Sequence, residues 1–338
     1  MVNFSYLILF IASIFIQYFL IKNRYLIGKY LKILDKPKND TIHKSITPLV
    51  GSFSLIIFSI FLIIFFNSDS LTEDILIIFS CSYLFFIIGY IDDRCNINAY
   101  TKLLCSTIIL ITALIFFENF LLKDIYVDFI ERRFVLNKTS IFFSILCLLL
   151  LINALNLIDG INGLASGFSS AWILCLSLLS SGNTRTFLII FSIFMIINTY
   201  QIIKGKYFLG DSGTLFLGSL IGLTTIYTYN NLLIKNNLIS VEKIFIFFMI
   251  PGIDMFRLFL VRLMNKRDPF KRDLNHMHHI ILKFSSLNTT LIIYLSLFVL
   301  TNFLSFFNII QPIVIILIYS ILYVFFILLS KKKFEKAS

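Results

Sequence analysis

The sequence predicts an all-α, polytopic integral membrane protein of about 10–11 transmembrane helices. Of its 338 residues, 58% are hydrophobic and 14% are charged, whereas an average soluble domain carries about 25% charged residues. Phenylalanine alone contributes 39 residues, and the mean hydropathy is +0.92. The net charge of +11 is interpreted as a sign of orientation in the membrane. The lipid bilayer is therefore an expected partner, and nucleic acid is not.

Spanning helices need about 20 apolar residues each, and the apolar runs of the chain meet this length approximately. We expect a single membrane-embedded domain, residues 1–338, because no soluble domain or fixed repeat is visible. The first run lacks a following small-residue cleavage site, so we interpret it as a retained helix. The expected spans are Phe4–Ile21, Leu49–Phe66, Ile75–Ile91, Leu103–Phe117, Ile141–Ile158, Leu164–Ser181, Thr186–Ile203, Leu215–Tyr229, Ile244–Met264, Leu291–Phe307 and Ile313–Ser330.

Lysine and arginine are unevenly distributed among the loops. With the N-terminus outside, the basic segment Lys22–Lys44 and the tail Lys331–Lys333 fall on the cytoplasmic side, as the positive-inside rule requires. The same topology places Asp92, Asp159 and Asp211 at the cytoplasmic face, although acidic residues did not enter that choice. This convergence predicts one active site facing the cytoplasm. The loops expected to form it are 22–48, 92–102, 153–167, 204–214 and 265–290.

Two adjacent carboxylates, Asp92 and Asp93, end the run Ile75–Ile91. Ionisable residues at a membrane span are energetically expensive and commonly mark functional sites. Because adjacent carboxylates repel each other, the pair can bind a divalent cation, act as a base or hold a lysine. Lys102 follows just before the next predicted helix. The alternative is a solvated pair of acids at a helix end.

Two further polar clusters combine oxygen ligands with glycine. Asn153, Asn156 and Asp159 are spaced by three and share one helix face, and the glycine-containing segment 160–167 follows them. The segment 210–213, Gly-Asp-Ser-Gly, places a carboxylate between glycines at an expected helix start. Carboxylate and amide oxygens are ligands that suit Mg²⁺, and glycine permits close approach of the backbone to a ligand. Hydrogen bonding between helices is the alternative for the amides.

The segment 265–279 is the most polar one expected on the cytoplasmic side. Its arginines can bind phosphate through two parallel hydrogen bonds, and His276, His278 and His279 can donate to phosphate or sugar oxygens. A zinc site is one alternative, although no cysteine or well-spaced fourth ligand is present. The other alternative is a basic loop beside the membrane that has no specific binding role.

Together these motifs indicate transfer of a phosphorylated group to a lipid acceptor, because phosphoryl transfer depends mainly on positioning and charge stabilisation. A transporter of a nucleotide-sugar or an anionic lipid is the rival hypothesis. Such transporters often have internal repeats and bind at the membrane midplane, and neither feature is visible here. A labelled-substrate assay separates the two hypotheses.

The chain resembles the bacterial polyprenyl-phosphate N-acetylhexosamine-1-phosphate transferases of glycosyltransferase family 4, the undecaprenyl-phosphate GlcNAc-1-phosphate transferase type. The motifs Asp-Asp, Asn-x-x-Asn-x-x-Asp-Gly, Gly-Asp-Ser-Gly and His-x-His-His occur in the family's order, and the resemblance runs from Asp35 to His279. It implies transfer of a sugar 1-phosphate from a UDP-activated amino sugar to undecaprenyl phosphate, with release of UMP. The reaction would initiate the synthesis of a cell-surface glycan at the bacterial inner membrane.

The resemblance also implies roles for individual residues. Asn156 and Asp211 would ligate Mg²⁺, for which Mn²⁺ is a possible substitute. Asn162 and Phe208 would contact the uracil, Phe208 by stacking. The Asp-Asp pair would lie at the acceptor phosphate, and which of its carboxylates, if either, acts as a base is left open. The expected catalytic residues are Asp92, Asp93, Lys102 and Asp159, and the expected donor-binding residues are Asn162, Phe208, Arg272, His276, His278 and His279.

The chain departs from the family pattern at Asp40, Leu49 and Ser52 in the first loop and at Gln201. The phospho-MurNAc-pentapeptide branch usually ends its last motif with His-His-His-Phe-Glu. Here Ile280–Ile281 follow instead, so this branch is disfavoured. The sequence leaves the amino sugar open between GlcNAc and 6-deoxy sugars such as QuiNAc or FucNAc, and it leaves a homodimer open.

Overall fold

The structure, a computed structural model, describes residues 2–37, 45–66, 73–234, 239–268 and 275–335. These residues are mostly helical, and seven helices within them are long and apolar enough to cross a membrane. The prediction of an all-α polytopic membrane protein is confirmed. The helices are α1 (Val2–Leu31), α2 (Gly51–Phe66), α3 (Glu73–Cys95), α4 (Ala99–Phe116), α5 (Ser140–Ile158), α6 (Leu164–Leu179), α7 (Gly182–Ile203), α8 (Gly210–Ile234), α9 (Val241–Met264), α10 (Met277–Leu282), α11 (Leu287–Phe306) and α12 (Pro312–Glu335).

Each predicted apolar run corresponds to one of these helices. No run extends more than two residues beyond the ends of its helix. Several helices extend further than the runs, into polar sequence. The helix α1 continues to Leu31, α3 continues to Cys95, and α8 begins at Gly210 instead of Leu215. A membrane helix satisfies its own backbone hydrogen bonds, so a polar extension is free to stay helical beyond the apolar part. These extensions carry most of the charged residues considered below.

The chain folds into two compact units. Unit 1 comprises Met1–Leu121 and Ile141–Thr228, and unit 2 comprises Leu122–Ser140 and Tyr229–Ser338. Besides helices, unit 1 contains the short antiparallel pair β1 (Leu34–Asp35) and β2 (Thr47–Pro48). Unit 2 contains the antiparallel hairpin of β3 (Asp124–Val127) and β4 (Arg132–Val135).

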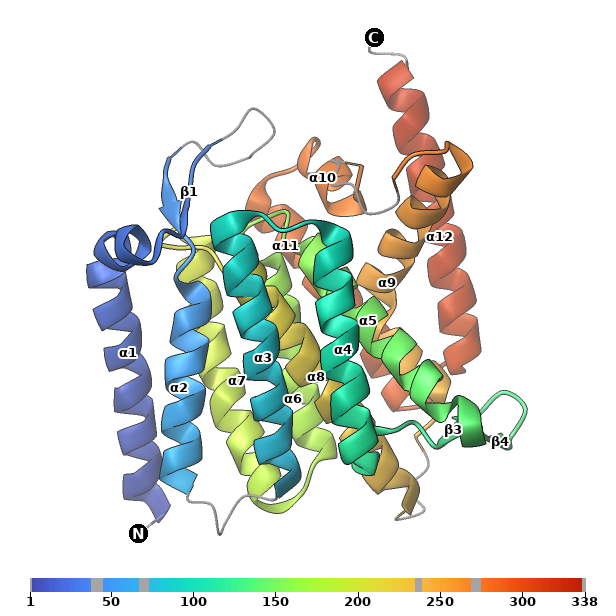
Figure 1. Ribbon diagram of the computed structural model, residues 1–338. Helices are drawn as coiled ribbons and strands as arrows, with labels where there is room; N and C mark the ends of the chain where they lie inside the picture. The colour runs from blue at the N-terminus through green and yellow to red at the C-terminus, as the bar shows by residue number, and fades with distance from the viewer. Residues whose placement is uncertain (1, 38–44, 67–72, 235–238, 269–274, 336–338) are drawn as a thin grey trace. The chain divides into compact units, whose positions relative to one another are not determined.

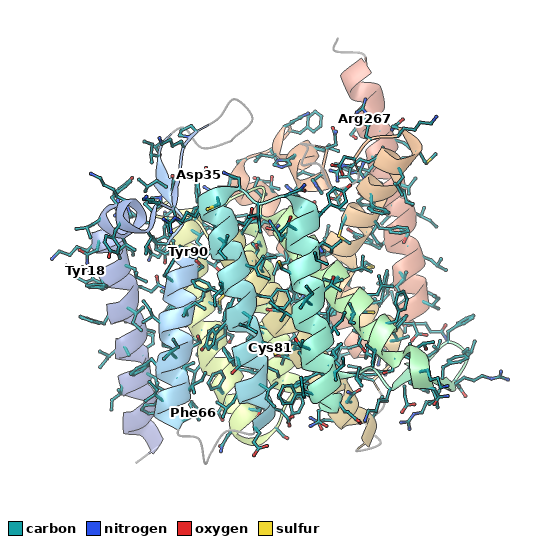
Figure 2. All side chains as sticks on the ribbon, in the orientation of Figure 1. Tyr18, Asp35, Phe66, Cys81, Tyr90 and Arg267 are labelled. Carbon is teal, nitrogen blue, oxygen red and sulfur yellow. The ribbon has the colours of Figure 1, made fainter. Side chains whose placement is uncertain are left out.

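In unit 1, the helices α1, α2, α3 and α4 run side by side (Figure 1). Aromatic packing holds this unit together, as the ring pair of Phe58 and Phe194 shows, with stacked centroids 4.0 Å apart. Figure 2 places Asp35 and Tyr90 at one end of the unit and Phe66 at the other. At the first end, the Tyr90 hydroxyl donates to the Leu31 carbonyl at 3.3 Å. All the candidate site residues of unit 1 come from helix ends and loops.

A close approach of backbone to backbone connects α3 with the start of α8. A Cβ added at Gly89 in α3 would meet the Asp211 carbonyl oxygen and the Ser212 Cα. Gly210, the first residue of α8, has a φ of +75°, a conformation that side chains with a Cβ rarely adopt. A Cβ there would also lie 2.7 Å from an Asp93 carboxylate oxygen. Glycine at both positions therefore lets the acidic end of α3 reach the first turn of α8.

We expect Gly89→Ala to destabilise unit 1 by about 1–3 kcal/mol or more, because overpacking against backbone atoms forces the two helices apart. The melting temperature of the purified protein in detergent would measure this loss. Gly252→Ala in α9 is the matched control, since nothing lies within 4 Å of a Cβ added there. Equal melting temperatures for Gly89→Ala and the wild type would contradict the close approach.

In unit 2, α9 packs against α11 and α12. The rings of Phe247 and Phe298 lie 5.7 Å apart between α9 and α11. Serine residues start both helices: the Ser240 hydroxyl accepts from the Lys243 amide, and the Ser286 hydroxyl accepts from the Thr289 amide. Such N-caps satisfy amides that have no partner within the helix. The proline inside α9, Pro251, does not interrupt it.

Candidate functional site

A lysine bridges two carboxylates at one end of unit 1. Lys102, in the first turn of α4, forms ion pairs with Asp92 at the end of α3 and with Asp211 at the start of α8. The distance from Lys102 Nζ to Asp211 Oδ2 is 2.5 Å. The side chains of Asp92, Lys102 and Asp211 are 9%, 12% and 16% exposed, so solvent screens this cluster weakly. Three helices that are separate in sequence thus contribute one charged cluster.

Asp93 has a different environment from its neighbour Asp92. Its Oδ1 accepts from the Asp211 amide at 2.8 Å, and its Oδ2 accepts from the Ser212 amide at 3.0 Å and the Ser212 hydroxyl at 2.6 Å. These amides belong to the first turn of α8, where backbone N–H groups lack intrahelical partners. Asp93 therefore caps α8 from the neighbouring helix. With both oxygens occupied, its geometry favours a structural role over that of a base.

Asn156 joins the same cluster through a threonine. The Thr214 hydroxyl, in the first turns of α8, donates to Asn156 Oδ1 at 2.9 Å. Asn156 lies in the last turns of α5, whose end is therefore held beside the start of α8. Ser52, one of the positions that departs from the family pattern, has its hydroxyl 2.8 Å from the Ser212 hydroxyl. The structure thus gives Ser52 a contact at the same helix start.

The segment that leads into α8 is fixed by two hydrogen bonds of the Phe208 backbone. The Phe208 amide donates to the Pro48 carbonyl at 3.0 Å, and the Gly51 amide donates to the Phe208 carbonyl at 2.9 Å. The preceding residue, Tyr207, is fully buried and hydrogen-bonds Gln17 of α1 and Asn198 of α7. Burial raises the pKa of Tyr207 well above its usual range, so this hydroxyl stays neutral. The ring of Phe208 is half-buried at the helix start that carries Asp211.

Asp159 and Asn162 lie in the turn between α5 and α6, and both are half-buried. Gly163 follows them with a φ of +88°. The structure therefore places both residues in one short connection that begins at the last turn of α5, three residues after Asn156. Their predicted roles, in catalysis for Asp159 and uracil binding for Asn162, stay predictions.

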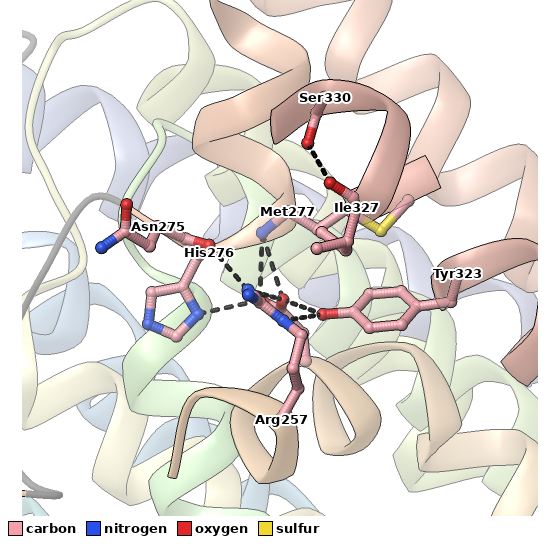
Figure 3. A network of polar contacts seen from close by, with 8 residues as sticks. Arg257, Asn275, His276, Met277, Tyr323, Ile327 and Ser330 are labelled. Atoms are coloured by element: carbon pink, nitrogen blue, oxygen red, sulfur yellow. Dashed lines mark hydrogen bonds and ion pairs between the residues drawn. The ribbon is translucent and has the colours of Figure 1, made fainter. Parts of the chain in front are cut away.

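In unit 2, Asp254 of α9 holds the histidine segment, and Figure 3 shows its partners His276, Met277 and Tyr323 close together. Its Oδ2 lies 2.8 Å from His276 Nδ1, and its Oδ1 accepts from the Met277 amide at 3.1 Å and the Tyr323 hydroxyl at 2.5 Å. Arg257, one turn further along α9, forms an ion pair with Asp254 at 3.1 Å. Arg257 also donates to the Asn275 carbonyl at 2.6 Å. The start of α10 is thus fixed to α9 and α12 by one buried carboxylate.

The three histidines lie together in this part of unit 2. The rings of His276 and His278 are stacked with centroids 5.3 Å apart, and those of His278 and His279 are 4.3 Å apart. His278 is fully buried, and neither of its ring nitrogens has a hydrogen-bond partner among the described residues. Burial, followed by the charges of His279 and His276, lowers the pKa of His278 well below its usual value. Arg272 lies outside the described residues.

Two groups of side chains are candidates for holding a metal ion. In unit 1, Asp92, Asp211 and Asn156 offer oxygen ligands, which Mg²⁺ prefers, and the Lys102 ammonium shows that a cation is favourable between the two carboxylates. In unit 2, the donor atoms of Asp254, His276 and His278 lie within 4.8 Å of one another. Nitrogen donors suit transition metals instead, and the Asp254 carboxylate already pairs with Arg257. The oxygen-lined cluster of unit 1 is therefore the better fit for Mg²⁺.

The structure therefore brings the three histidines together in unit 2 and five other predicted site residues together in unit 1. These five are Asp92, Asp93, Lys102, Asn156 and Asp211. Sequence reasoning did not assign a role to Arg257, Tyr323 or Ser212. The spacing of Asp254 and Arg257, three residues apart within an apolar helix, is a signal for an ion pair on one helix face. The hydroxyl of Tyr323, one of 15 tyrosines in the chain, gave no comparable signal.

The comparison with protein families agrees with these positions. A family model described as glycosyl transferase family 4 matches residues 75–229, the segment that supplies Asp92, Asp93, Lys102, Asn156 and Asp211. Over this segment the chain is similar to glycosyl transferase family 4. The family match thus covers the charged cluster of unit 1 and ends before the histidine segment of unit 2.

Curated relatives extend the similarity beyond this family 4 segment. The chain is 27% identical over 274 residues to a probable undecaprenyl-phosphate N-acetylglucosaminyl 1-phosphate transferase of Bacillus subtilis (strain 168), covering 78% of this chain and 74% of the relative. It is 26% identical over 266 residues to the undecaprenyl-phosphate alpha-N-acetylglucosaminyl 1-phosphate transferase of Escherichia coli O157:H7, covering 76% and 71%. A Yersinia pestis protein with the latter name is 26% identical over 265 residues, covering 74% and 70%.

Proposed function

We propose that this protein is a member of glycosyl transferase family 4 that transfers an N-acetylhexosamine 1-phosphate from a UDP-sugar to undecaprenyl phosphate and releases UMP. The reaction would be the initiating step in the synthesis of a cell-surface polysaccharide, O-antigen or cell-wall glycan. The observation that carries the proposal is the cluster of Asp92, Lys102 and Asp211, with Asn156 beside it, at one end of a membrane helix unit. The names of the relatives supply the substrates, and they give no support to the transporter hypothesis.

In the proposed reaction, a phosphate oxygen of undecaprenyl phosphate attacks the β-phosphorus of the UDP-sugar. The bond between that phosphorus and the bridging oxygen breaks, the oxygen leaves with UMP, and the sugar 1-phosphate becomes joined to the lipid as a pyrophosphate. Lys102 offsets negative charge that develops on the leaving group. Asp92, whose carboxylate is not used to cap α8, is the better candidate of the Asp-Asp pair to orient or deprotonate the acceptor phosphate.

Mg²⁺ is the proposed cofactor, held by Asn156 and Asp211, and bound there it would neutralise phosphate charge as a Lewis acid. Mn²⁺ takes similar oxygen ligands and is expected to replace it. The half-buried ring of Phe208 is proposed to stack on the uracil, with Asn162 and Asp159 contributing from the α5–α6 turn. His276, His278, His279 and Arg272 are proposed to bind the donor.

We also propose that the protein resides in the bacterial inner membrane and that the site faces the cytoplasm. The end of unit 1 that carries Asp92, Lys102 and Asp211 is the end at which α1 finishes in the basic segment Lys22–Lys32. Basic loops stay on the cytoplasmic side of the membrane. The charged substrate UDP-sugar would therefore reach the site from the cytoplasm.

An assay with purified protein in lipid tests the proposal. Labelled UDP-GlcNAc, undecaprenyl phosphate and Mg²⁺ are incubated together, and we expect label in the organic phase in a 1:1 ratio with released UMP. A screen of UDP-linked amino sugars, with the 6-deoxy sugars included, then identifies the donor. No transfer from any of these donors would overturn the proposal, and uptake into vesicles without UMP release would favour a transporter.

A further inference from the structure

The hairpin β3–β4 of unit 2, green in Figure 1, exposes large apolar side chains at its tip and along its outer strand. Phe129 and Ile130 in the turn are 67% and 46% exposed, and Phe134 and Val135 in β4 are 46% and 62% exposed. A water-facing hairpin would normally place polar residues at such positions. None of the roles described above uses this surface.

Glu242 fixes the position of this turn. Its carboxylate accepts from the backbone amides of Asp128 and Phe129, each at 3.1 Å. Glu242 itself is buried in the first turn of α9, which is a candidate membrane span. The Tyr126 amide adds a second attachment, since it donates to the Tyr229 hydroxyl at 2.9 Å. The tip of the hairpin is therefore held at the level where a spanning helix begins, which is the membrane interface.

The charges around the tip match the surface of a membrane. Arg132 is exposed and directly follows the turn, and Lys138 is exposed between the hairpin and α5. The second arginine of β4, Arg133, pairs with Asp124 across the hairpin. Exposed basic residues beside apolar side chains are the pattern of segments that lie in the interface, where cations meet lipid phosphates and apolar groups meet the acyl chains.

We propose that the tip of this hairpin inserts Phe129 and Ile130 into the lipid interface of the leaflet at which α9 begins. Arg132 and Lys138 then contact lipid phosphates, and Glu242 holds the turn at the correct depth. The partner of this surface is the bilayer itself. The hairpin thereby anchors the connection between α4 and α5, two helices that contribute Lys102 and Asn156.

Tryptophan fluorescence tests the insertion. The chain has one tryptophan, Trp172, so Phe129→Trp is made in a Trp172→Phe background and placed in lipid nanodiscs. We expect its emission to lie to the blue of free tryptophan, to be quenched by bromines on the lipid acyl chains and to resist aqueous iodide. Ile130→Trp serves as a second probe in case the first variant does not fold. Lys36→Trp, at an exposed residue of unit 1, is the control that iodide should quench.

Iodide quenching of both tip probes without bromine quenching would overturn the proposal, because it would place the tip in water. Protection from both quenchers would also overturn it and would indicate a protein surface, such as a second copy of this chain. The readout does not depend on enzymatic activity, so it stays valid whatever the outcome of the transfer assay.

Discussion

Asp211→Asn is expected to reduce transfer by about 10³-fold, because it removes a charge that acts on the reacting phosphates in a weakly screened site. The asparagine keeps the size of the side chain but loses the charge that pairs with Lys102 at 2.5 Å. The variant should still fold, since Asp93 caps α8 through the backbone amides of Asp211 and Ser212. Initial rates of lipid-linked product formation would measure the loss.

The matched control is Asp124→Asn, which also removes a carboxylate from an ion pair, in this case with Arg133, but lies in the hairpin of unit 2. It should retain wild-type transfer. The elution profile and melting temperature of Asp211→Asn should remain close to those of the wild type. Full activity in Asp211→Asn would contradict the assignment of the site.

Lys102→Met should have a comparable effect on transfer and an additional effect on stability. The substitution leaves the buried carboxylates of Asp92 and Asp211 facing each other without their cation, and unpaired buried charge costs about 3–5 kcal/mol. A divalent cation can restore the charge balance between the two carboxylates. A ligand that binds only the folded state stabilises that state by about 2.7 kcal/mol at 100 times its Kd. We therefore expect Mg²⁺ to raise the melting temperature of Lys102→Met more than that of the wild type.

Thermal unfolding with and without Mg²⁺ checks this prediction, and Lys204→Met is its control. Lys204 is exposed, and its side-chain ammonium lies over the ring of Tyr200, so replacing this side chain should change neither stability nor the response to Mg²⁺. An equal Mg²⁺ response in Lys102→Met, Lys204→Met and the wild type would show that Lys102 does not occupy a cation position between two carboxylates.

The helices were predictable because the bilayer imposes one rule on every span, a long apolar run with its backbone satisfied internally. The gathering of Asp92, Lys102 and Asp211 was predictable as well, since alternating helices bring the end of α3 and the starts of α4 and α8 to the same face. Helix ends were less predictable. The start of α8 at Gly210 depends on a cap that Asp93 provides from another helix.

Side-chain roles that depend on packing were beyond sequence reasoning. Adjacent in sequence, Asp92 and Asp93 look equivalent, yet only Asp93 reaches the amides of α8, because Gly89 lets α3 approach that helix closely. In unit 2, the histidine pattern was visible, but the buried Asp254 that holds His276 gains its partners from α12 and from the segment before α10. Such contacts join residues as far apart as 254 and 323, and no local pattern encodes them.

The central claim is that the ends of separate helices in unit 1 form one cation site, and binding of Mn²⁺ measured by electron paramagnetic resonance tests it most directly. The wild type, Asp211→Asn and Asp124→Asn are titrated with Mn²⁺ in detergent without substrate. The account predicts a saturable site in the wild type and in Asp124→Asn that is lost or strongly weakened in Asp211→Asn. The same Mn²⁺ affinity in all three proteins would contradict it.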